Sequence, residues 1–214
     1  MIIDSHVHMF PDKIAKKTLD HLSQIAQSPY HTDGTAAGTV QAFDRWGIQA
    51  GIVMHIATKP SQQTTINNWA ASLQKEYLGR LFCCGTIHPK AEDALEEIDR
   101  IRERGLHGIK LHPDYQDFMV DDPQMYPIYE KIADSGLPVV FHTGWDPLSP
   151  NCVHASAKGI KKVAKLFPTL KIVAAHMGGM RRYDESEEEL AGIDTVWFDT
   201  AMSFLYCPPE QVLR

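Results

Sequence analysis

The sequence predicts an α/β protein of the TIM-like (β/α)8 barrel type, here with seven βα units. Short apolar runs alternate with longer amphipathic segments along the 214 residues, a pattern typical of repeated βα units around a parallel sheet. Histidines also stand where most of the expected strands end. Because parallel strands point one way, their carboxyl ends meet at one rim, where barrels place their chemically active residues. The strand-end histidines are His6, His8, His55, His88, His112, His142 and His176.

The expected strands are short apolar runs bounded by Gly, Pro or polar residues. Polar residues alternate within some of them, so that Asp4, His6 and His8 share one face of the first strand. Strands of a doubly wound sheet would be almost continuously apolar, and no GxGxxG follows the first strand, so a dinucleotide site is not expected. The strands are expected at residues 2–6, 51–55, 81–87, 108–112, 138–142, 171–176 and 195–200.

Helices are expected in the amphipathic segments that follow the strands. The first begins near Pro11, whose fixed φ suits a first helical turn. Segment 91–105 has apolar residues at helical spacing and ends at Gly105, a residue that suits a helix C-terminus. Pro127 is expected to bend or restart the helix over 122–136. The remaining helices are expected at residues 64–77, 154–166 and 185–190, with a last one beginning in 208–214.

Composition and charge fit one ordinary domain over residues 1–214. The net charge of −6, without a run of Lys or Arg, gives no reason to expect a nucleic-acid or membrane partner, so a small-molecule substrate is expected. No signal peptide precedes the first strand and no apolar stretch approaches a membrane span. The four cysteines form no CxxC pair, so a reducing cytoplasm is the expected location. A homodimer is an open alternative to a monomer. Residues 27–39 are expected to form a loop above the strand ends.

An HxH pair on the first strand is the sharpest motif. His6 and His8 stand two residues apart on one strand, so both imidazoles point to the same side, as a metal grip requires. His142 and His176 follow apolar runs and are expected to project into the same rim. A catalytic zinc site commonly uses three protein ligands and keeps a position for water. The sequence therefore predicts a site for one divalent metal ion, either Zn or, as the alternative, Mn. The competing interpretation is that these histidines lie on the surface or are hydrogen-bonded in the core.

The motifs DSHVH, GIKLHP, MYPIYEKIADSGLPVVFHTG and AAHMGG resemble the amidohydrolase superfamily, specifically its amidohydrolase-2 branch, over most of the chain. The resemblance implies a metal-dependent hydrolase, in which metal-activated water attacks an amide, ester or lactone of a small organic acid. The same branch contains non-oxidative decarboxylases of aromatic or muconate-type acids. It implies His6, His8 and His142 as metal ligands and His176 as the catalytic histidine.

The branch has one more site residue, an Asp at the end of an eighth strand. This sequence ends before such a segment, and Asp199, at the end of the seventh strand, does not match it by position. A barrel typically needs about 250 residues. The barrel domain is therefore expected to be incomplete at its C-terminus, and a non-catalytic protein or a fragment is the third alternative.

Five further residues are candidates for substrate binding or for support of the ligands. Asp4 is expected to orient an imidazole or a loop amide. Lys110 would be a carboxylated metal bridge, as in other branches of the superfamily, or would balance charge or bind an acid group of the substrate. His112 would line the pocket or hydrogen-bond a loop, and Trp145 would form a pocket wall. Arg181 would bind a carboxylate or lie in solvent.

Overall fold

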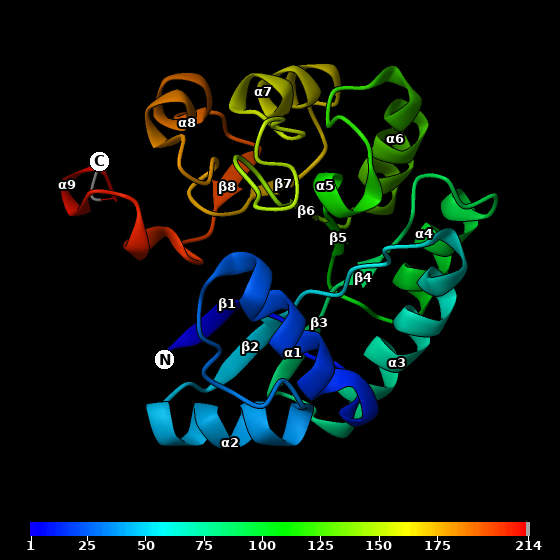
Figure 1. The fold of residues 1–214 in the computed structure, drawn as a ribbon. Helices are drawn as coiled ribbons and strands as arrows, with labels where there is room; N and C mark the ends of the chain where they lie inside the picture. Colours follow the sequence, from blue (N-terminus) through cyan, green and yellow to red (C-terminus); the bar gives the residue numbers. More distant parts are fainter. Residues whose placement is uncertain (213–214) are drawn as a thin grey trace.

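Parallel strands surrounded by helices form the centre of the protein, whose computed structural model describes residues 1–212 (Figure 1). The strands form a three-stranded sheet and a five-stranded sheet, and every neighbouring pair is parallel. The first sheet contains β1 (Ile3–Val7), β2 (Ala50–Val53) and β3 (Leu81–Cys83). The second contains β4 (Gly85–Thr86), β5 (Ile109–Leu111), β6 (Val139–Phe141), β7 (Ile172–Ala174) and β8 (Val196–Phe198).

The two sheets meet within the expected strand 81–87, which the structure divides at Cys84. Cys84 still donates its backbone N–H to Val53 O at 2.9 Å, whereas Gly85 donates to Gly108 O at 2.9 Å. β3 therefore pairs with β2, and β4 continues the series to β5. The strands occupy seven positions in chain order, as expected for seven βα units of a barrel, and β1 and β8 lie at the two ends of the series.

Buried side chains of two helices hold the divided strand. Asn67, on α3 (Gln63–Glu76), donates through Nδ2 to Thr86 O and accepts the Thr86 N–H through Oδ1, both at 2.8 Å. The same amide donates to Glu97 Oε1 at 2.8 Å from α4 (Ala94–Glu103), and Glu97 is fully buried. Thr64 and Arg100 also donate to the Glu97 carboxylate. The Asn67 side chain thus provides hydrogen-bond partners for the Thr86 backbone at the point where the chain passes from the first sheet to the second.

We expect Asn67→Ala to lower the free energy of unfolding by about 3 kcal/mol. The change leaves the Thr86 N–H and C=O unpaired in the interior, and each buried unpaired group costs about 1–3 kcal/mol. Asn68→Ala is the matched control, because Asn68 is exposed on the same helix and its one hydrogen bond, accepted from Arg104 Nε, is in solvent, so its loss should cost less than about 1 kcal/mol. Urea unfolding followed by circular dichroism measures both. Equal costs for the two variants would show that the Asn67 contacts contribute no stability.

The predicted helices are present, and two further helices, α2 (Ala36–Trp46) and the short α5 (Pro113–Gln116), were not predicted. α1 (Asp12–Ala26) begins after Pro11, and α6 (Tyr126–Ser135) follows a 3-10 turn and has Pro127 in its first turn. Thr35 caps α2 by accepting the Gly38 N–H at 3.0 Å. The other helices are α7 (Ala157–Leu166), α8 (Tyr183–Leu190) and α9 (Pro209–Val212), and residues 213–214 of the expected last helix lie outside the described residues.

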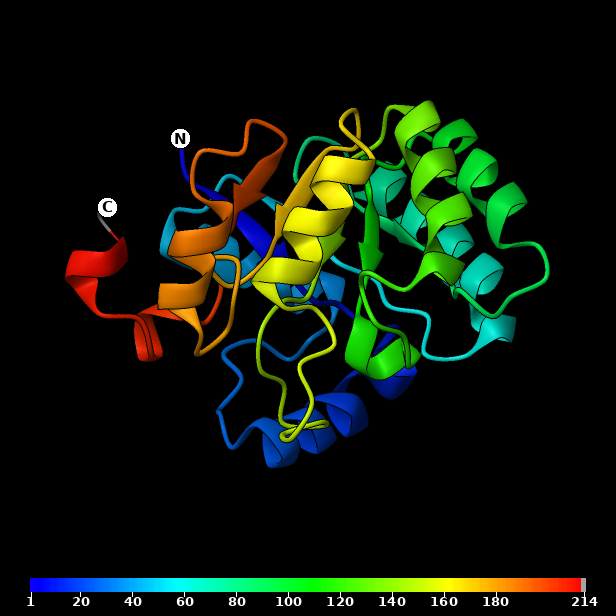
Figure 2. The same ribbon diagram turned by 90° about the horizontal axis from the view of Figure 1, so that it is seen from above.

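The loops and short helices that follow the strands lie together at the carboxyl ends of the strands. Figure 2 shows α1, α5 and the loop between β6 and α7 together at the carboxyl ends of the strands. α3, α4, α6, α7 and α8 lie outside the strands (Figures 1 and 2). Within residues 1–212, none of the helices has both the length and the apolarity that crossing a bilayer requires.

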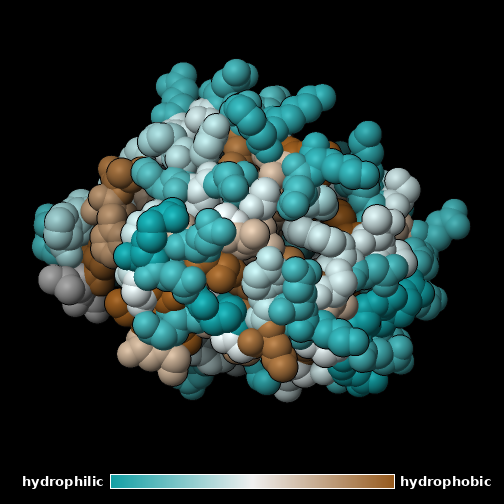
Figure 3. All heavy atoms as spheres, turned by 90° about the horizontal axis from the view of Figure 1, so that it is seen from below, coloured by the Kyte–Doolittle hydropathy of each residue, from teal (hydrophilic) through white to brown (hydrophobic). Residues whose placement is uncertain are grey.

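The side chains of the strands pack in two layers. Those facing the helices are apolar and form the large core, for example Ile109, Val139 and Ile172. The opposite face carries a smaller group of Met54, Cys84 and Val140, and Lys110 is the register partner of Val140. Large apolar side chains are exposed on the two edge strands and in the C-terminal segment of the described residues, and Figure 3 shows apolar surface on the left of its view. These side chains are Ile2, Ile3, Trp197, Phe198, Met202, Phe204, Leu205 and Tyr206.

Candidate metal centre

The strand ends bring the predicted histidines together. The ring centroids of His6 and His8 lie 5.1 Å apart, and those of His6 and His176 lie 5.2 Å apart. His142 follows at 4.7 Å from His176. The convergence arises because His6 and His8 stand at the end of β1, His142 directly follows β6, and His176 follows β7. Four imidazoles from three strands therefore form one cluster at the carboxyl rim.

His6 and His8 each have one ring nitrogen engaged by a protein acceptor. His6 Nδ1 lies 2.7 Å from Asp199 Oδ2, and His8 Nδ1 lies 2.9 Å from Met54 O. Each Nδ1 is thus placed to carry the proton, which leaves the lone pair on Nε2, as in metal-binding histidines whose other nitrogen donates to a carboxylate or carbonyl. Burial lowers the pKa of both rings, so both are neutral near pH 7. This donor set fits a divalent metal ion.

Asp199 contributes to this cluster, although the sequence analysis set it aside. It directly follows β8. Its Oδ1 accepts the backbone N–H groups of His176 at 2.9 Å and Ala201 at 3.1 Å, while Oδ2 accepts from His6. Burial alone would raise the pKa of Asp199, but the hydrogen bonds from the His6 ring and the His176 backbone N–H hold the pKa well below its usual range. The carboxylate is ionised and joins the ends of β1, β7 and β8.

His176 is held in an uncommon backbone conformation. His176 and Met177 have φ of 59° and 55°, in the left-handed region that residues other than glycine seldom adopt. The Met177 N–H donates to Asp199 O at 2.7 Å, which fixes this turn. His176 Nδ1 lies 2.8 Å from Ala201 O, and its Nε2 lies 3.0 Å from His142 Nδ1. Strained backbone that the surroundings hold in place is frequent at functional sites.

Lys110 lies beneath the histidines, where its charge acts on several of them. It is 1% exposed, and its Nζ has no hydrogen-bond partner among the described residues. Burial lowers the pKa of Lys110 to about 8, so a neutral fraction exists at slightly alkaline pH. Its charge also contributes to the lowered pKa values of His6, His8, His112, His142 and His176.

Asp4, His112, Trp145 and Arg181, the other residues predicted to support the site, differ in their contacts. Asp4 accepts the backbone N–H of His6 at 3.1 Å, so it orients the strand and not an imidazole. His112 directly follows β5 and stacks on His142, with ring centroids 4.2 Å apart and an interplanar angle of 10°. Trp145 lies under the Arg181 guanidinium, whose central carbon is 4.1 Å from the ring centroid.

Asp146 and Asp114 are two site residues that the sequence analysis missed. Asp146 Oδ2 lies 3.4 Å from His142 Nε2 and 3.7 Å from His112 Nε2. Burial raises the pKa of Asp146 to about 6. Asp114 is buried beside His112. Their only sequence signals are the spacings HxD after β5 and HxxxD after β6.

Two groups of possible ligand atoms result, each with its atoms within 4.8 Å of one another. His6, His176 and Asp199 form one, and His112, His142 and Asp146 form the other.

The family described as Amidohydrolase matches residues 3–210. The chain belongs to this amidohydrolase family. A comparison with curated protein sequences gave no match.

Solved structures show the same fold at low sequence identity. An uncharacterized TIM-barrel protein from Bordetella bronchiseptica has a TM-score of 0.73 at 18% identity, over 99% of this chain and 78% of that one. 5-Carboxyvanillate decarboxylase from Novosphingobium aromaticivorans, with bound manganese, has a TM-score of 0.64 at 19% identity, over 83% and 66% of the chains. A probable 2-pyrone-4,6-dicarboxylic acid hydrolase from Acinetobacter baumannii, with citric acid bound, has a TM-score of 0.62 at 15% identity, over 99% and 74%.

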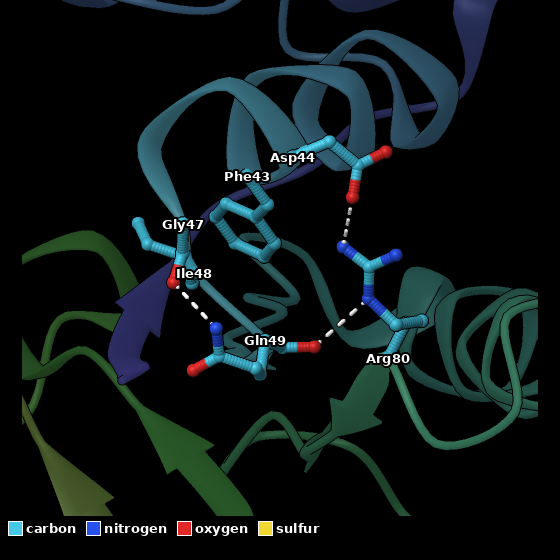
Figure 4. Close-up of a pocket in the computed structure, with 6 residues that line it drawn as sticks. All are labelled: Phe43, Asp44, Gly47, Ile48, Gln49 and Arg80. Atoms are coloured by element: carbon cyan, nitrogen blue, oxygen red, sulfur yellow. Dashed lines mark hydrogen bonds and ion pairs between the residues drawn. The ribbon is translucent and has the colours of Figure 1, made fainter. Parts of the chain in front are cut away.

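A surface pocket at the opposite end of this amidohydrolase takes no part in the site. Phe43, Asp44, Gly47, Ile48, Gln49 and Arg80 line it (Figure 4). Gln49 and Arg80 directly precede β2 and β3, so the pocket lies at the amino ends of the strands. Arg80 donates to Asp44 Oδ1 at 2.7 Å and to Gln49 O at 2.8 Å. The guanidinium is therefore engaged within the protein, and these contacts tie α2 to the strands.

Proposed function

We propose that this amidohydrolase is a metal-dependent hydrolase that cleaves an amide, ester or lactone of a small organic acid. The observation that carries the proposal is the engagement of His6 and His8 through Nδ1, which leaves both Nε2 atoms for a cation. A carboxy-lyase acting on an aromatic acid is the second candidate. It is favoured by the likeness to 5-carboxyvanillate decarboxylase, whereas the likeness to a probable dicarboxylic acid hydrolase favours the first.

In this proposal, His6 and His8 hold the cation and His142 is the third ligand that the family resemblance implies. A bound divalent ion would polarise substrate oxygen atoms and make a water molecule more acidic. We propose Zn²⁺, with Mn²⁺ as the alternative that the manganese-bound neighbour supports. Asp199 fixes the His6 ring and the His176 backbone, and so keeps the ligand side of the cluster in place.

His176 is proposed to handle the proton. Burial lowers the pKa of His176 to about 3, so its ring is neutral near pH 7. Nδ1 is placed to donate to Ala201 O, so Nε2 carries the lone pair, which accepts from His142 Nδ1 until a reacting group takes the place of that contact. Its neighbour His142 Nδ1 is then the donor in the contact between the two rings.

Arg181 is proposed to recognise the acid group of the substrate. Its guanidinium lies between the rings of Trp145 and Tyr206, at 4.1 and 4.4 Å from their centroids. Neither contact uses its N–H groups, and among the described residues the guanidinium has these two rings as its contacts and no ion pair. A planar guanidinium held in this way suits a carboxylate. The Trp145 backbone N–H donates to Met180 O at 2.9 Å, and this bond keeps Arg181 close to the loop that carries Asp146.

A substrate panel tests the proposal. The protein is loaded with Zn²⁺ or Mn²⁺ and given lactones and esters of dicarboxylic acids, and separately aromatic acids with an adjacent hydroxyl. We expect hydrolysis, measured by proton release, and no release of CO₂. Arg181→Ala should raise KM at least about 10-fold, the loss expected for a charged hydrogen bond of about 1.5 kcal/mol, whereas Arg102→Ala, on the exposed side of α4, should not. CO₂ release would support the lyase, and inactivity on both substrate classes with either metal would contradict the proposal.

A further inference from the structure

Large apolar side chains gather on the side of the protein where the two outermost strands lie. Among the described residues, β1 pairs with β2 and β8 pairs with β7, so the outer edge of each strand faces away from the sheets. Figures 1 and 2 show β1, β8 and the segment after β8 on this side of the molecule. The edge patch consists of Ile2, Ile3, Trp197, Phe198 and the exposed apolar side chains of residues 202–206.

Contacts beside the edge patch keep its parts next to one another. The carboxyl ends of β8 and β1 are joined by the contact of 2.7 Å between Asp199 Oδ2 and His6 Nδ1. The chain that follows turns back at once, because Asp199 Oδ1 accepts the Ala201 N–H at 3.1 Å. The Tyr206 ring then contacts the Arg181 guanidinium, 4.4 Å from the ring centroid. The segment that carries much of the patch is therefore held against the strands.

The edge patch contains no charged side chain. Residues 1–3, 197–198 and 200–209 are without Asp, Glu, Lys and Arg, although the whole chain has a net charge of −6. A nucleic acid or a charged protein segment is selected by complementary charges, and this surface has none to offer. The composition of the patch therefore favours an apolar occupant.

The size of the edge patch matches one side of a dimer interface. An aromatic side chain has about 150–250 Å² of surface, and about half of that surface is exposed in the aromatic residues of the patch. Together with the aliphatic side chains, the patch offers roughly 700 Å² of apolar surface. Monomeric proteins seldom expose a contiguous apolar patch larger than about 300–600 Å², whereas a stable interface buries about 800 Å² on each partner.

We propose that the edge patch is the docking surface for a second copy of this chain, in a dimer with two-fold symmetry. In such a dimer the same patch serves on both subunits, so an apolar surface without charges is its own complement. The dimer also covers the outer edges of β1 and β8, whose backbone groups would otherwise be open to pairing with any other chain. Trp197 and Phe204 are the expected anchors, because buried aromatic side chains contribute most to interface stability.

The dimer supports the segment that borders the proposed site. Tyr206 belongs to the patch and contacts the Arg181 guanidinium, and Phe198 directly precedes Asp199. A second copy seated on the patch therefore keeps residues 198–206 in place beside the histidine cluster. Formation of the dimer itself does not depend on the proposed function.

Sedimentation velocity between about 1 and 100 µM protein tests the dimer, because association depends on the concentration of the chain. We expect a species with twice the mass of one chain in the wild type. Phe204→Glu and Leu205→Glu place a charge at the two most exposed side chains of the patch. Each should raise the dissociation constant at least about 30-fold, the loss expected for an interface anchor. Trp46→Glu and Leu78→Glu are the matched controls at exposed apolar positions outside the patch, and they should leave the dimer intact.

Hydrogen exchange on the wild type adds a measurement that needs no variant. The amides of residues 197–206 should exchange more slowly at about 100 µM than at about 1 µM protein. A monomer at every concentration, a dimer that both folded Glu variants retain, or protected amides confined to other segments would each overturn the proposal. A monomer that binds phosphatidylcholine vesicles would also overturn it and would assign the patch to a lipid surface. Circular dichroism shows which variants are folded, and if neither folds, hydrogen exchange alone decides.

Discussion

Replacing His6 or His8 by asparagine should lower kcat/KM by at least about 10³-fold, equivalent to about 4 kcal/mol of transition-state stabilisation. Asparagine removes the imidazole nitrogen that each strand end directs into the cluster, while it retains a polar side chain. Bound metal should be lost at the same time, because one ligand then remains in the HxH pair. The fold should be retained, since neither residue belongs to the apolar core, but His6→Asn should lower the unfolding transition because it removes a hydrogen bond to the buried Asp199 carboxylate.

His21→Asn is the control for this change. His21 is exposed on α1, so its replacement should leave activity, metal content and stability as they are. Turnover, metal content and thermal unfolding are measured on all three variants. If the His6 and His8 variants keep both metal and activity, the HxH pair does not bind the metal ion. If the variants unfold, the role of the pair is structural.

Acid should destabilise the metal-free protein steeply below about pH 6.5. Burial lowers the pKa of His55 to about 4 and that of His176 to about 3, and it also lowers the pKa values of His6 and His8. Unfolded histidines bind protons near pH 6.5, whereas the folded ones do not, so stability is lost as the pH falls from the unfolded pKa toward the folded one. His55 alone would account for about 3 kcal/mol by pH 4.

Asp146 acts in the opposite direction over part of this range. Its folded pKa is raised to about 6, so its protonated form favours the folded state as the pH falls from 6 toward 4. The histidines outnumber it, so the net loss remains several kcal/mol, a large share of the roughly 5–15 kcal/mol of a typical domain. Urea midpoints between pH 7.5 and 4, measured with chelator, test this. His55→Gln should flatten the curve, and an unchanged midpoint between pH 7 and 5 would show that the histidines are not held neutral.

The strands could be predicted because each is a short apolar run, and the convergence of the histidines followed from parallel strands alone. The division of the strand at Cys84 could not, because it depends on the contact of Asn67 with Thr86 and Glu97 from two other elements. α2 was missed although Thr35 and Gly47 mark its ends, since the Ser, Pro and Gly residues just before it indicated a loop.

The carboxylates of the site were harder to predict than its histidines. Asp199 meets His6 across 193 residues of chain, and only the arrangement of β8 relative to β1 creates that contact. The family resemblance placed the acidic site residue on an eighth strand, so Asp199 was not predicted as a site residue. Asp199 nevertheless follows its strand directly, as His112 and His142 follow theirs. Asp146 depends on the turn at Gly144, which no apolar pattern marks.

The HxH pair of β1 is proposed to hold a divalent cation through the Nε2 atoms of His6 and His8. Diffraction from crystals grown with Zn²⁺ or Mn²⁺, with anomalous differences collected at the absorption edge of the metal, tests it most directly. We expect an anomalous peak at about 2.0–2.2 Å from the Nε2 atoms of both His6 and His8, with Asp199 still hydrogen-bonded to His6 Nδ1. A metal-loaded crystal with no peak shared by these two nitrogens would contradict it.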